Sequence, residues 1–168
     1  MIAFRDAKPT EAALISSIFA RSWRGLYRDV IDPDYLARLP EEYWVPSVRS
    51  WLESGQFNGL FLCINDVPVG CIIYGPGRDA SHADWGEILS LYLLPDYTRM
   101  GLGGRLIDEA LRRLRAEGYR QVYLWAIEGS LADRSFYARQ GFRRTEDVVD
   151  YRIGSRPVRD VRYVRDMA

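Results

Sequence analysis

The sequence predicts a mixed α/β fold of the α+β class, in which helices do not alternate regularly with the strands of the sheet. Apolar runs typical of strands follow one another without a helix in the first half, and they alternate with helical patterns in the second half. The expected order is strand, helices, hairpin, long strand, helix, strand, helix and terminal strands. This order differs from the uniform alternation that builds a fully parallel sheet.

Length and composition indicate one globular domain spanning residues 1–168, with 48% hydrophobic and 27% charged residues. The 23 basic residues equal the 23 acidic ones, which removes the net attraction that nucleic-acid binders usually show. No apolar run approaches the roughly 20 residues that span a bilayer, and the first ten residues do not resemble a secretory signal. We therefore expect a cytoplasmic protein with neither a nucleic-acid nor a membrane partner, and the sequence leaves a homodimer open.

The first half of the chain is expected to hold a strand, several helices and a β-hairpin. Residues 2–6 alternate apolar and polar side chains, and Thr10 can then cap an amphipathic helix. Prolines divide the following segment into short helical pieces. Two apolar runs, 59–64 and 68–74, surround an Asn65–Asp66 turn and predict an antiparallel hairpin.

The second half contains the most regular patterns. Residues 87–94 are nearly all apolar and stop at Pro95, which predicts a buried strand near the centre of the sheet. A long amphipathic helix is expected to begin at Gly101 and end at Gly118. The remaining expected elements are a strand at 122–127, a helix at 130–140 and two strands around a turn at 154–157.

A glycine-rich segment, residues 97–105, lies between that central strand and the first turn of the long helix. Free backbone amides and the helix dipole attract anions at such a place, and glycine lets a phosphate approach the main chain. A tight turn would require the same glycines, so the cluster alone leaves both interpretations open. A dinucleotide fingerprint needs glycine where Leu106 stands, and a Walker loop needs Gly-Lys-Ser or Gly-Lys-Thr, so neither pattern is present.

At this segment the sequence resembles the GNAT acetyltransferase family, whose signature is Arg or Gln, two variable residues, Gly, one variable residue, then Gly or Ala. The glycines fall on Gly101 and Gly103, while Thr98 stands where the family has the longer polar residue. Residues 90–97 are similar to the family's fourth strand and its exit. Residues 135–142 are similar to its late helix, which ends in Gly-Phe.

The resemblance implies a central mixed, largely antiparallel sheet of about seven strands with helices on both faces and splayed fourth and fifth strands. It implies acetyl-CoA as co-substrate and no metal, with pantetheine in the gap between those strands and pyrophosphate on the following helix. The implied cofactor-binding residues are Leu91, Tyr92, Leu93, Arg99, Met100, Gly101, Leu102, Gly103, Gly104, Arg105 and Ser130. Ordinary strand packing is the alternative for the leucines, and helix capping is the alternative for Ser130.

Two catalytic residues are implied as well. Glu87 lies eleven residues before Thr98, the register of the catalytic glutamate in the histone-acetylating branch, and it would act as the base. A strand-end charge or a partner for an arginine fits Glu87 equally well. Tyr137 matches the family tyrosine that protonates the leaving thiolate, and a buried structural tyrosine is the alternative.

The expected function is transfer of an acetyl group from acetyl-CoA to a primary amine by direct attack in a ternary complex. The alternative is an acyl-CoA-binding or sensing module with little or no catalysis. The acceptor stays open between a small molecule and a peptide amine. A cationic acceptor or an ordinary acidic surface would explain the acidic side chains that lie where the family shapes its acceptor site: Asp29, Asp32, Asp34, Glu41 and Glu42.

Overall fold

The strands of the computed structural model join one sheet, and the structure describes residues 1–129 and 131–167, without the side chains of 131–133. The strands in this part of the chain are β1 (Ile2–Asp6), β2 (Asn58–Ile64), β3 (Val67–Pro76), β4 (Gly86–Leu93), β5 (Gln121–Ile127), β6 (Arg143–Ile153) and β7 (Arg156–Asp166). The helices are α1 (Ala12–Leu26), α2 (Pro33–Arg38), α3 (Val45–Glu53), α4 (Leu102–Ala116) and α5 (Leu131–Arg139).

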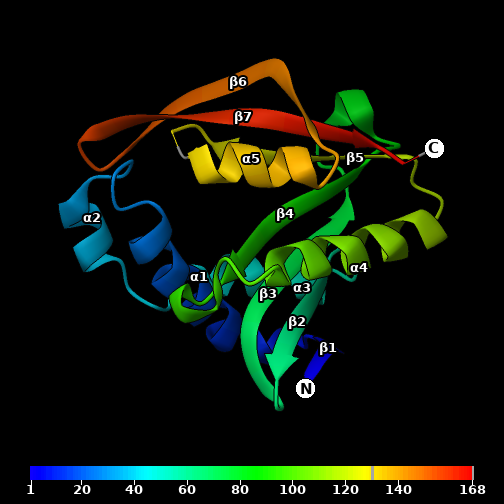
Figure 1. The fold of residues 1–168 in the computed structure, drawn as a ribbon, viewed down its shortest axis with the longest axis horizontal. Coiled ribbons are helices and arrows are strands. Elements are labelled where there is room, and N and C mark those ends of the chain that lie inside the picture. The colour runs from blue at the N-terminus through cyan, green and yellow to red at the C-terminus, as the bar shows by residue number, and fades with distance from the viewer. Residues whose placement is uncertain (130, 168) are drawn as a thin grey trace.

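The sheet is mixed and largely antiparallel. Its order is β1-β2-β3-β4-β5-β7-β6, and every neighbouring pair is antiparallel except β4 and β5, which are parallel. The expected fold class is therefore confirmed, and β4 is the central strand (Figure 1). The position of β7 between β5 and β6 follows from pairing between distant segments and has no local signal in the sequence.

The hairpin between β2 and β3 turns at the residues that the sequence indicated. Asn65 and Asp66 have φ angles of 49° and 68°, which is the left-handed backbone of a type I′ turn. Asn and Asp tolerate this conformation better than other non-glycine residues. The turn pairs Ile64 with Val67. A bulge after the next pair then shifts the register, so that Phe61 lies opposite Cys71 on one buried face.

Helices cover both faces of the sheet. On one face, α4 buries Leu106, Ile107 and Leu114 against the central strands, and α5 lies beside β7 (Figure 1). Each such side chain contributes about 1.5–3 kcal/mol through removal of apolar surface from water. On the other face, α1 and α3 form a second core that includes Ile18 and Phe19. No helix in the described part of the chain is long and apolar enough to cross a membrane.

The parallel pair at the centre of the sheet separates after three residues. The ladder runs from Gly86–Val122 to Ile88–Leu124, and within the described residues it goes no further. On the other side of β4, the pairing with β3 shifts register at Leu89, because Ser90 lies opposite Ile73 and Ile88 opposite Tyr74. Such a bulge increases local twist, which turns the end of β4 away from β5. The predicted splay between these strands is therefore present.

Candidate active site

The backbone leading into α4 has an open, uncapped helix start. A short turn, Pro95–Tyr97, follows β4, and then Arg99 and Gly101 adopt positive φ angles of 62° and 77°. Among the described residues, no side chain caps the amino end of α4. A Cβ built on Gly101 would meet no atom within 4 Å, so space adjoins the main chain here. The free backbone amides and the helix dipole at this point can bind an anion.

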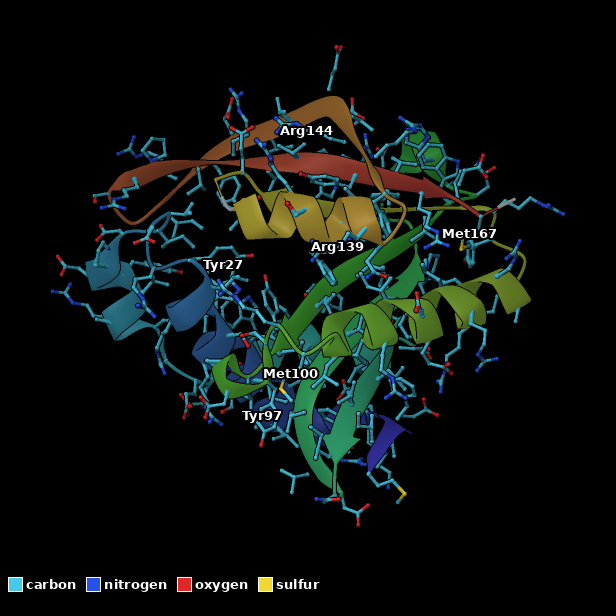
Figure 2. The ribbon with its side chains drawn as sticks, viewed as in Figure 1. Tyr27, Tyr97, Met100, Arg139, Arg144 and Met167 are labelled. Carbon is cyan, nitrogen blue, oxygen red and sulfur yellow. The ribbon has the colours of Figure 1, made fainter. Side chains whose placement is uncertain are left out.

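The side chains around this helix start are mostly exposed. Figure 2 shows Tyr97 and Met100 on the connection between β4 and α4. Arg99, Met100 and Arg105 are exposed, whereas Leu102 is buried in the core. Thr98 donates its hydroxyl to the Pro95 carbonyl oxygen at 3.0 Å, so its short side chain stabilises the turn itself. Two guanidinium groups are thus available beside the open backbone.

Gly103 and Gly104, in the first turn of α4, face α5 and the residue that follows it. A Cβ on Gly103 would lie 3.2 Å from the Phe136 ring, and one on Gly104 would lie 2.7 Å from the Gln140 amide nitrogen. Both glycines therefore permit close packing of α5 on α4. Their contact with a cofactor remains a prediction, and of the three glycines at the start of α4 it is Gly101 whose Cβ position is open.

The end of β4 that has separated from β5 presents main-chain groups on the side where it has no partner strand. Leu94 N–H donates to Val69 O, across to β3, at 2.8 Å. Because successive residues of a strand point to opposite edges, the amides of Leu91 and Leu93 point to the β5 side. The Leu93 carbonyl oxygen accepts a hydrogen bond from the Ser22 hydroxyl on α1. This edge can pair with an extended ligand, as predicted for the pantetheine arm.

The side chains of this segment alternate between the two faces. Leu91 and Leu93 pack against the core beneath α4. Tyr92 packs on the other face, where its ring centroid lies 5.1 Å from that of Phe19. Its hydroxyl oxygen lies 3.4 Å from that of Tyr27, at the carboxyl end of α1 (Figure 2). A ligand between the splayed strands would therefore have leucines on one side and tyrosines on the other.

Glu87 is a buried carboxylate bound by an arginine. It is 1% exposed and lies on the paired part of β4. Arg78 donates from Nε to Oε1 at 3.0 Å and from Nη2 to Oε2 at 2.7 Å, and its backbone N–H adds a third bond to Oε1. The Tyr123 hydroxyl also donates to Oε1, at 3.1 Å, and burial keeps the pKa of Tyr123 above its usual value. The arginine partner that the sequence left open is thus Arg78, and the base role of Glu87 remains a prediction.

Tyr137 lies on α5, on the same face as α4. Its ring is half-buried, and its centroid lies 5.3 Å from that of Tyr163 and 6.2 Å from that of Phe142. It packs against the core cluster that Leu91 and Leu93 also contact. The tyrosine is therefore on the leucine side of the splayed strands. Ser130, the other predicted residue near α5, lies outside the described residues.

On the face of the sheet opposite α4 and α5, the structure contains polar groups that the sequence did not single out. The Tyr151 hydroxyl donates to Asp160 Oδ1 at 2.9 Å, and burial raises the pKa of Asp160. Trp23 Nε1 is the one buried side-chain nitrogen or oxygen in the described residues that lacks a hydrogen-bond partner. Nothing in the alternating stretch of β7 distinguishes Asp160 from an ordinary strand residue.

Among the acidic residues that lie where the family shapes its acceptor site, Asp32 has a structural role. Asp32 caps α2 by accepting from Asp34 N–H at 3.0 Å. It also accepts from the backbone and the hydroxyl of Ser155, which ties α2 to the turn between β6 and β7. These bonds hold the pKa of Asp32 below its usual value. The Asp32 carboxylate therefore stabilises the fold through these hydrogen bonds.

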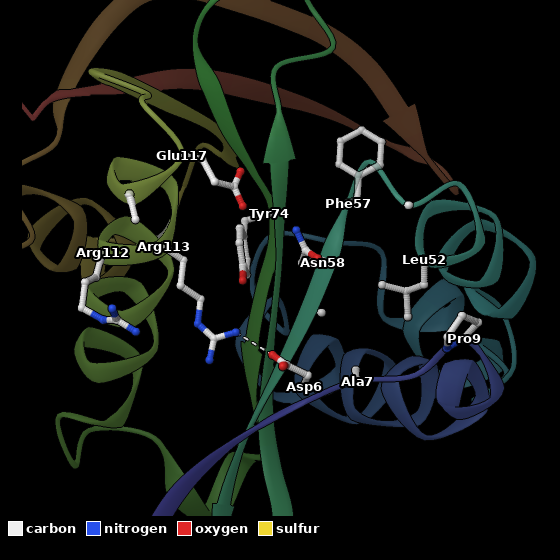
Figure 3. A pocket seen from close by; sticks show the side chains of 13 residues that line it. Asp6, Ala7, Pro9, Leu52, Phe57, Asn58, Tyr74, Arg112, Arg113 and Glu117 are labelled. Atoms are coloured by element: carbon white, nitrogen blue, oxygen red, sulfur yellow. Dashed lines mark hydrogen bonds and ion pairs between the residues drawn. The ribbon is translucent and has the colours of Figure 1, made fainter.

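A cavity of about 540 Å³ has Tyr74 and Phe57 in its lining (Figure 3). It adjoins the carboxyl half of α4, where Arg113 in its lining pairs with Asp6, also in the lining, and with Glu109 outside it. It contains none of the predicted site residues. In the residues that the structure describes, no group of three or more His, Cys, Asp or Glu side chains could hold a metal ion.

A mixed sheet with a separated central parallel pair beside an uncapped, glycine-rich helix start is the arrangement that the sequence resemblance implied. Comparison with known proteins agrees, because the sequence profile of the acetyltransferase (GNAT) family matches residues 15–142. The chain belongs to this family, and it is an N-acetyltransferase that depends on acetyl-CoA.

Relatives and solved structures extend the comparison beyond the profile. The chain is 27% identical over 153 residues to the uncharacterized N-acetyltransferase YuaI of Bacillus subtilis, covering 88% of this chain and 84% of the relative. It is 23% identical over 143 residues to a spermidine N(1)-acetyltransferase of Thermoplasma acidophilum, covering 84% and 88%. The crystal structure of PaiA N-acetyltransferase from Thermoplasma acidophilum, a complex with coenzyme A, matches 99% of both chains with a TM-score of 0.80 at 20% identity.

Proposed function

We propose that this enzyme transfers the acetyl group of acetyl-CoA to a primary amine by direct attack within a ternary complex. The observation that carries the proposal is the continuity of two binding features along one stretch of chain. The unpaired edge of β4 at Leu91 and Leu93 leads directly into the open helix start at Gly101. The first suits an extended amide-bearing arm, and the second suits the pyrophosphate attached to it.

Charge at the helix start supports the phosphate end of this assignment. The amino end of a helix carries roughly half a positive charge. Arg99 and Arg105 add exposed guanidinium groups, which bind phosphate in a bidentate manner. Thr98 adds no cation, so we propose that backbone amides and these two arginines supply the phosphate contacts.

In the proposed reaction, the amine nitrogen attacks the thioester carbonyl carbon, the carbon–sulfur bond breaks and the thiolate must take up a proton. Tyr137 supplies that proton from the leucine side of the splayed strands, where α5 holds it. Glu87 takes the proton lost by the amine, through a water. Its Oε2 accepts one hydrogen bond, from Arg78, whereas Oε1 accepts three, so Oε2 is the oxygen proposed to act.

The acceptor is proposed as an amine on the face of the sheet opposite α4. The name of the spermidine acetyltransferase relative supports an aliphatic amine, and the coenzyme A complex of the PaiA structure supports the donor. Splayed strands give access from both faces, so donor and acceptor can meet without sharing an entrance.

The test is release of free thiol from acetyl-CoA in the presence of a panel of primary amines, with secondary and tertiary amines of similar size as controls. We expect turnover with primary amines and none without an acceptor. An enzyme that binds acetyl-CoA but acetylates no amine would exclude the proposal.

A further inference from the structure

Asp160 lies beside the splayed end of the central strands. It is aligned with Ile127 on β5 and with Val149 on β6. Ile127 comes three residues after Leu124, the last β5 residue that pairs with β4. Asp160 is therefore level with the part of β4 that lacks a β5 partner, which is where the proposed reaction takes place.

The carboxylate is on the face away from α4 and α5. Ile127 and Val158 belong to a buried cluster that also contains Tyr27, and Tyr92 and Tyr151 pack against this cluster. Side chains two residues apart on a strand share a face, so Asp160 shares the face of Val158. Val149, the residue opposite it, is 49% exposed, so solvent reaches this part of the face.

Asp160 has no counter-charge within the described residues, where its one side-chain partner is the Tyr151 hydroxyl. Arg159 points to the other face, where it pairs with Asp150 at 2.7 Å. Arg162 shares the face of Asp160, but it is bound by two carboxylates at 2.8 and 3.0 Å, those of Asp79 and Asp147. A half-buried carboxylate without a cation costs free energy that a positively charged ligand would recover.

Aromatic side chains of α1 and β4 pack against the same buried cluster as Ile127 and Val158. The ring centroid of Trp23 lies 5.1 Å from that of Tyr27 and 6.5 Å from that of Tyr92. Burial raises the pKa of Tyr151, so its hydroxyl stays a donor to Asp160. Aromatic faces attract ammonium groups and pack against aliphatic chains. The buried, unpartnered Trp23 Nε1 adds a donor that a polar ligand or water would satisfy.

We infer that Asp160, held by Tyr151, binds a cationic group of the acceptor, so that the acceptor is an aliphatic amine with a second positive charge, as in a diamine or polyamine. One amine attacks the thioester between the splayed strands while the other is bound at Asp160. This inference rests on the proposed function and adds the class of acceptor to it.

The experiment compares a diamine with the monoamine of equal chain length, in the wild-type enzyme and in Asp160→Asn. The matched control is Asp150→Asn, which removes an exposed carboxylate from the opposite face of the neighbouring strand. We expect the wild type to prefer the diamine in kcat/KM, and Asp160→Asn to lose about 30-fold or more toward the diamine only, as for removal of one member of a desolvated charge pair. The Kd for acetyl-CoA should stay unchanged in both variants.

Equal kcat/KM for diamine and monoamine in the wild type would overturn the inference without any variant. Equal losses toward both amines in Asp160→Asn would also overturn it, because a structural role would not discriminate between them. Tyr151→Phe keeps the carboxylate and should give the same selectivity change with a smaller loss. Acetyl-CoA binding without acetylation of any amine would instead exclude the proposed function, so the two failures are distinguishable.

Discussion

Glu87 and Arg78 form a two-point ion pair in which the carboxylate is buried and the guanidinium is half exposed. Arg78 lies just past the end of β3, and Glu87 on β4 is paired with β3 on one side and with β5 on the other. Glu87 lies opposite Tyr123 on β5, and its carboxylate accepts the hydrogen bond of the Tyr123 hydroxyl. It therefore links β4 to β5 within the short segment where these parallel strands are paired. The pair thus lies immediately before the splay.

The first prediction concerns this pair and stability. Arg78→Met keeps the apolar stem but leaves Glu87 buried without its cation, and we expect a loss of about 2–3 kcal/mol in the free energy of unfolding. Glu87→Gln should cost less, because the neutral amide oxygen still accepts hydrogen bonds. Urea unfolding of both single variants and the double variant gives the coupling energy. If the double variant loses the sum of the two single losses, the ion pair contributes nothing.

The same glutamate tests the proposed base. Glu87→Gln should lower turnover near neutral pH, and the defect should shrink under alkaline conditions, where free amine is abundant without a base. The measurement is a pH–rate profile at saturating acetyl-CoA. A defect of equal size from neutral to alkaline pH would assign Glu87 to positioning with Arg78 rather than to proton transfer.

The second prediction concerns Gly101. Gly101→Ala places a Cβ in the open space beside the helix start, and it should weaken coenzyme A binding measured by calorimetry. A left-handed alanine also costs about 1 kcal/mol in stability. Gly55→Ala is the matched control, because Gly55 has a φ of 74° against 77° for Gly101 and also meets no atom within 4 Å. Both variants should lose similar stability, and coenzyme A affinity lost equally in both would refute the phosphate assignment.

The third prediction concerns Tyr137. Tyr137→Phe keeps the ring contacts with Tyr163 and removes the hydroxyl, so kcat should fall on the order of 100-fold with nearly unchanged affinity for acetyl-CoA. Tyr119→Phe is the control, since Tyr119 packs against the same core at the far end of α4. Steady-state kinetics and calorimetry separate the two effects. Full activity of Tyr137→Phe at every pH would remove this residue from the mechanism.

The fourth prediction uses the raised pKa of Asp160. A carboxyl group with a pKa higher in the folded than in the unfolded state favours folding most when it is protonated, and this contribution is lost as pH rises through the folded pKa. Asp160→Asn should therefore raise the melting temperature at neutral pH. The gain should disappear below the unfolded pKa of about 3.9. A lower melting temperature at neutral pH would indicate that the charged Asp160 stabilises the fold itself.

Local patterns were sufficient to predict the elements on which the donor site is proposed. The apolar run that ends at Pro95 gave β4, and the amphipathic stretch between Gly101 and Gly118 gave α4. Strand splay was implied by family resemblance alone, because the bulge at Leu89 has no residue signal of its own. The glycine cluster alone left a phosphate loop and a tight turn open. It did not indicate that Gly103 lies against the Phe136 ring of α5, because that packing joins distant segments.

The proposed acceptor side could not be predicted from the sequence, because the residues proposed for it come from distant segments. Asp160 and Tyr151 lie on the last two strands, whereas Trp23 and Tyr27 lie on the first helix. Only the insertion of β7 beside β5 brings Asp160 level with the splay. Arg78 was missed for the same reason, since a loop arginine shows no partner until β3 and β4 are paired.

Amide hydrogen exchange with and without acetyl-CoA tests most directly whether the donor binds between the splayed strands and at the start of α4. We predict slower exchange at Leu91, Leu93 and the amides of 101–104, where ligand groups would accept their hydrogen bonds. Exchange around Phe57 and Glu117, at the cavity of Figure 3, should stay unchanged. Protection at that cavity with none at Leu91, Leu93 or 101–104 would contradict the account.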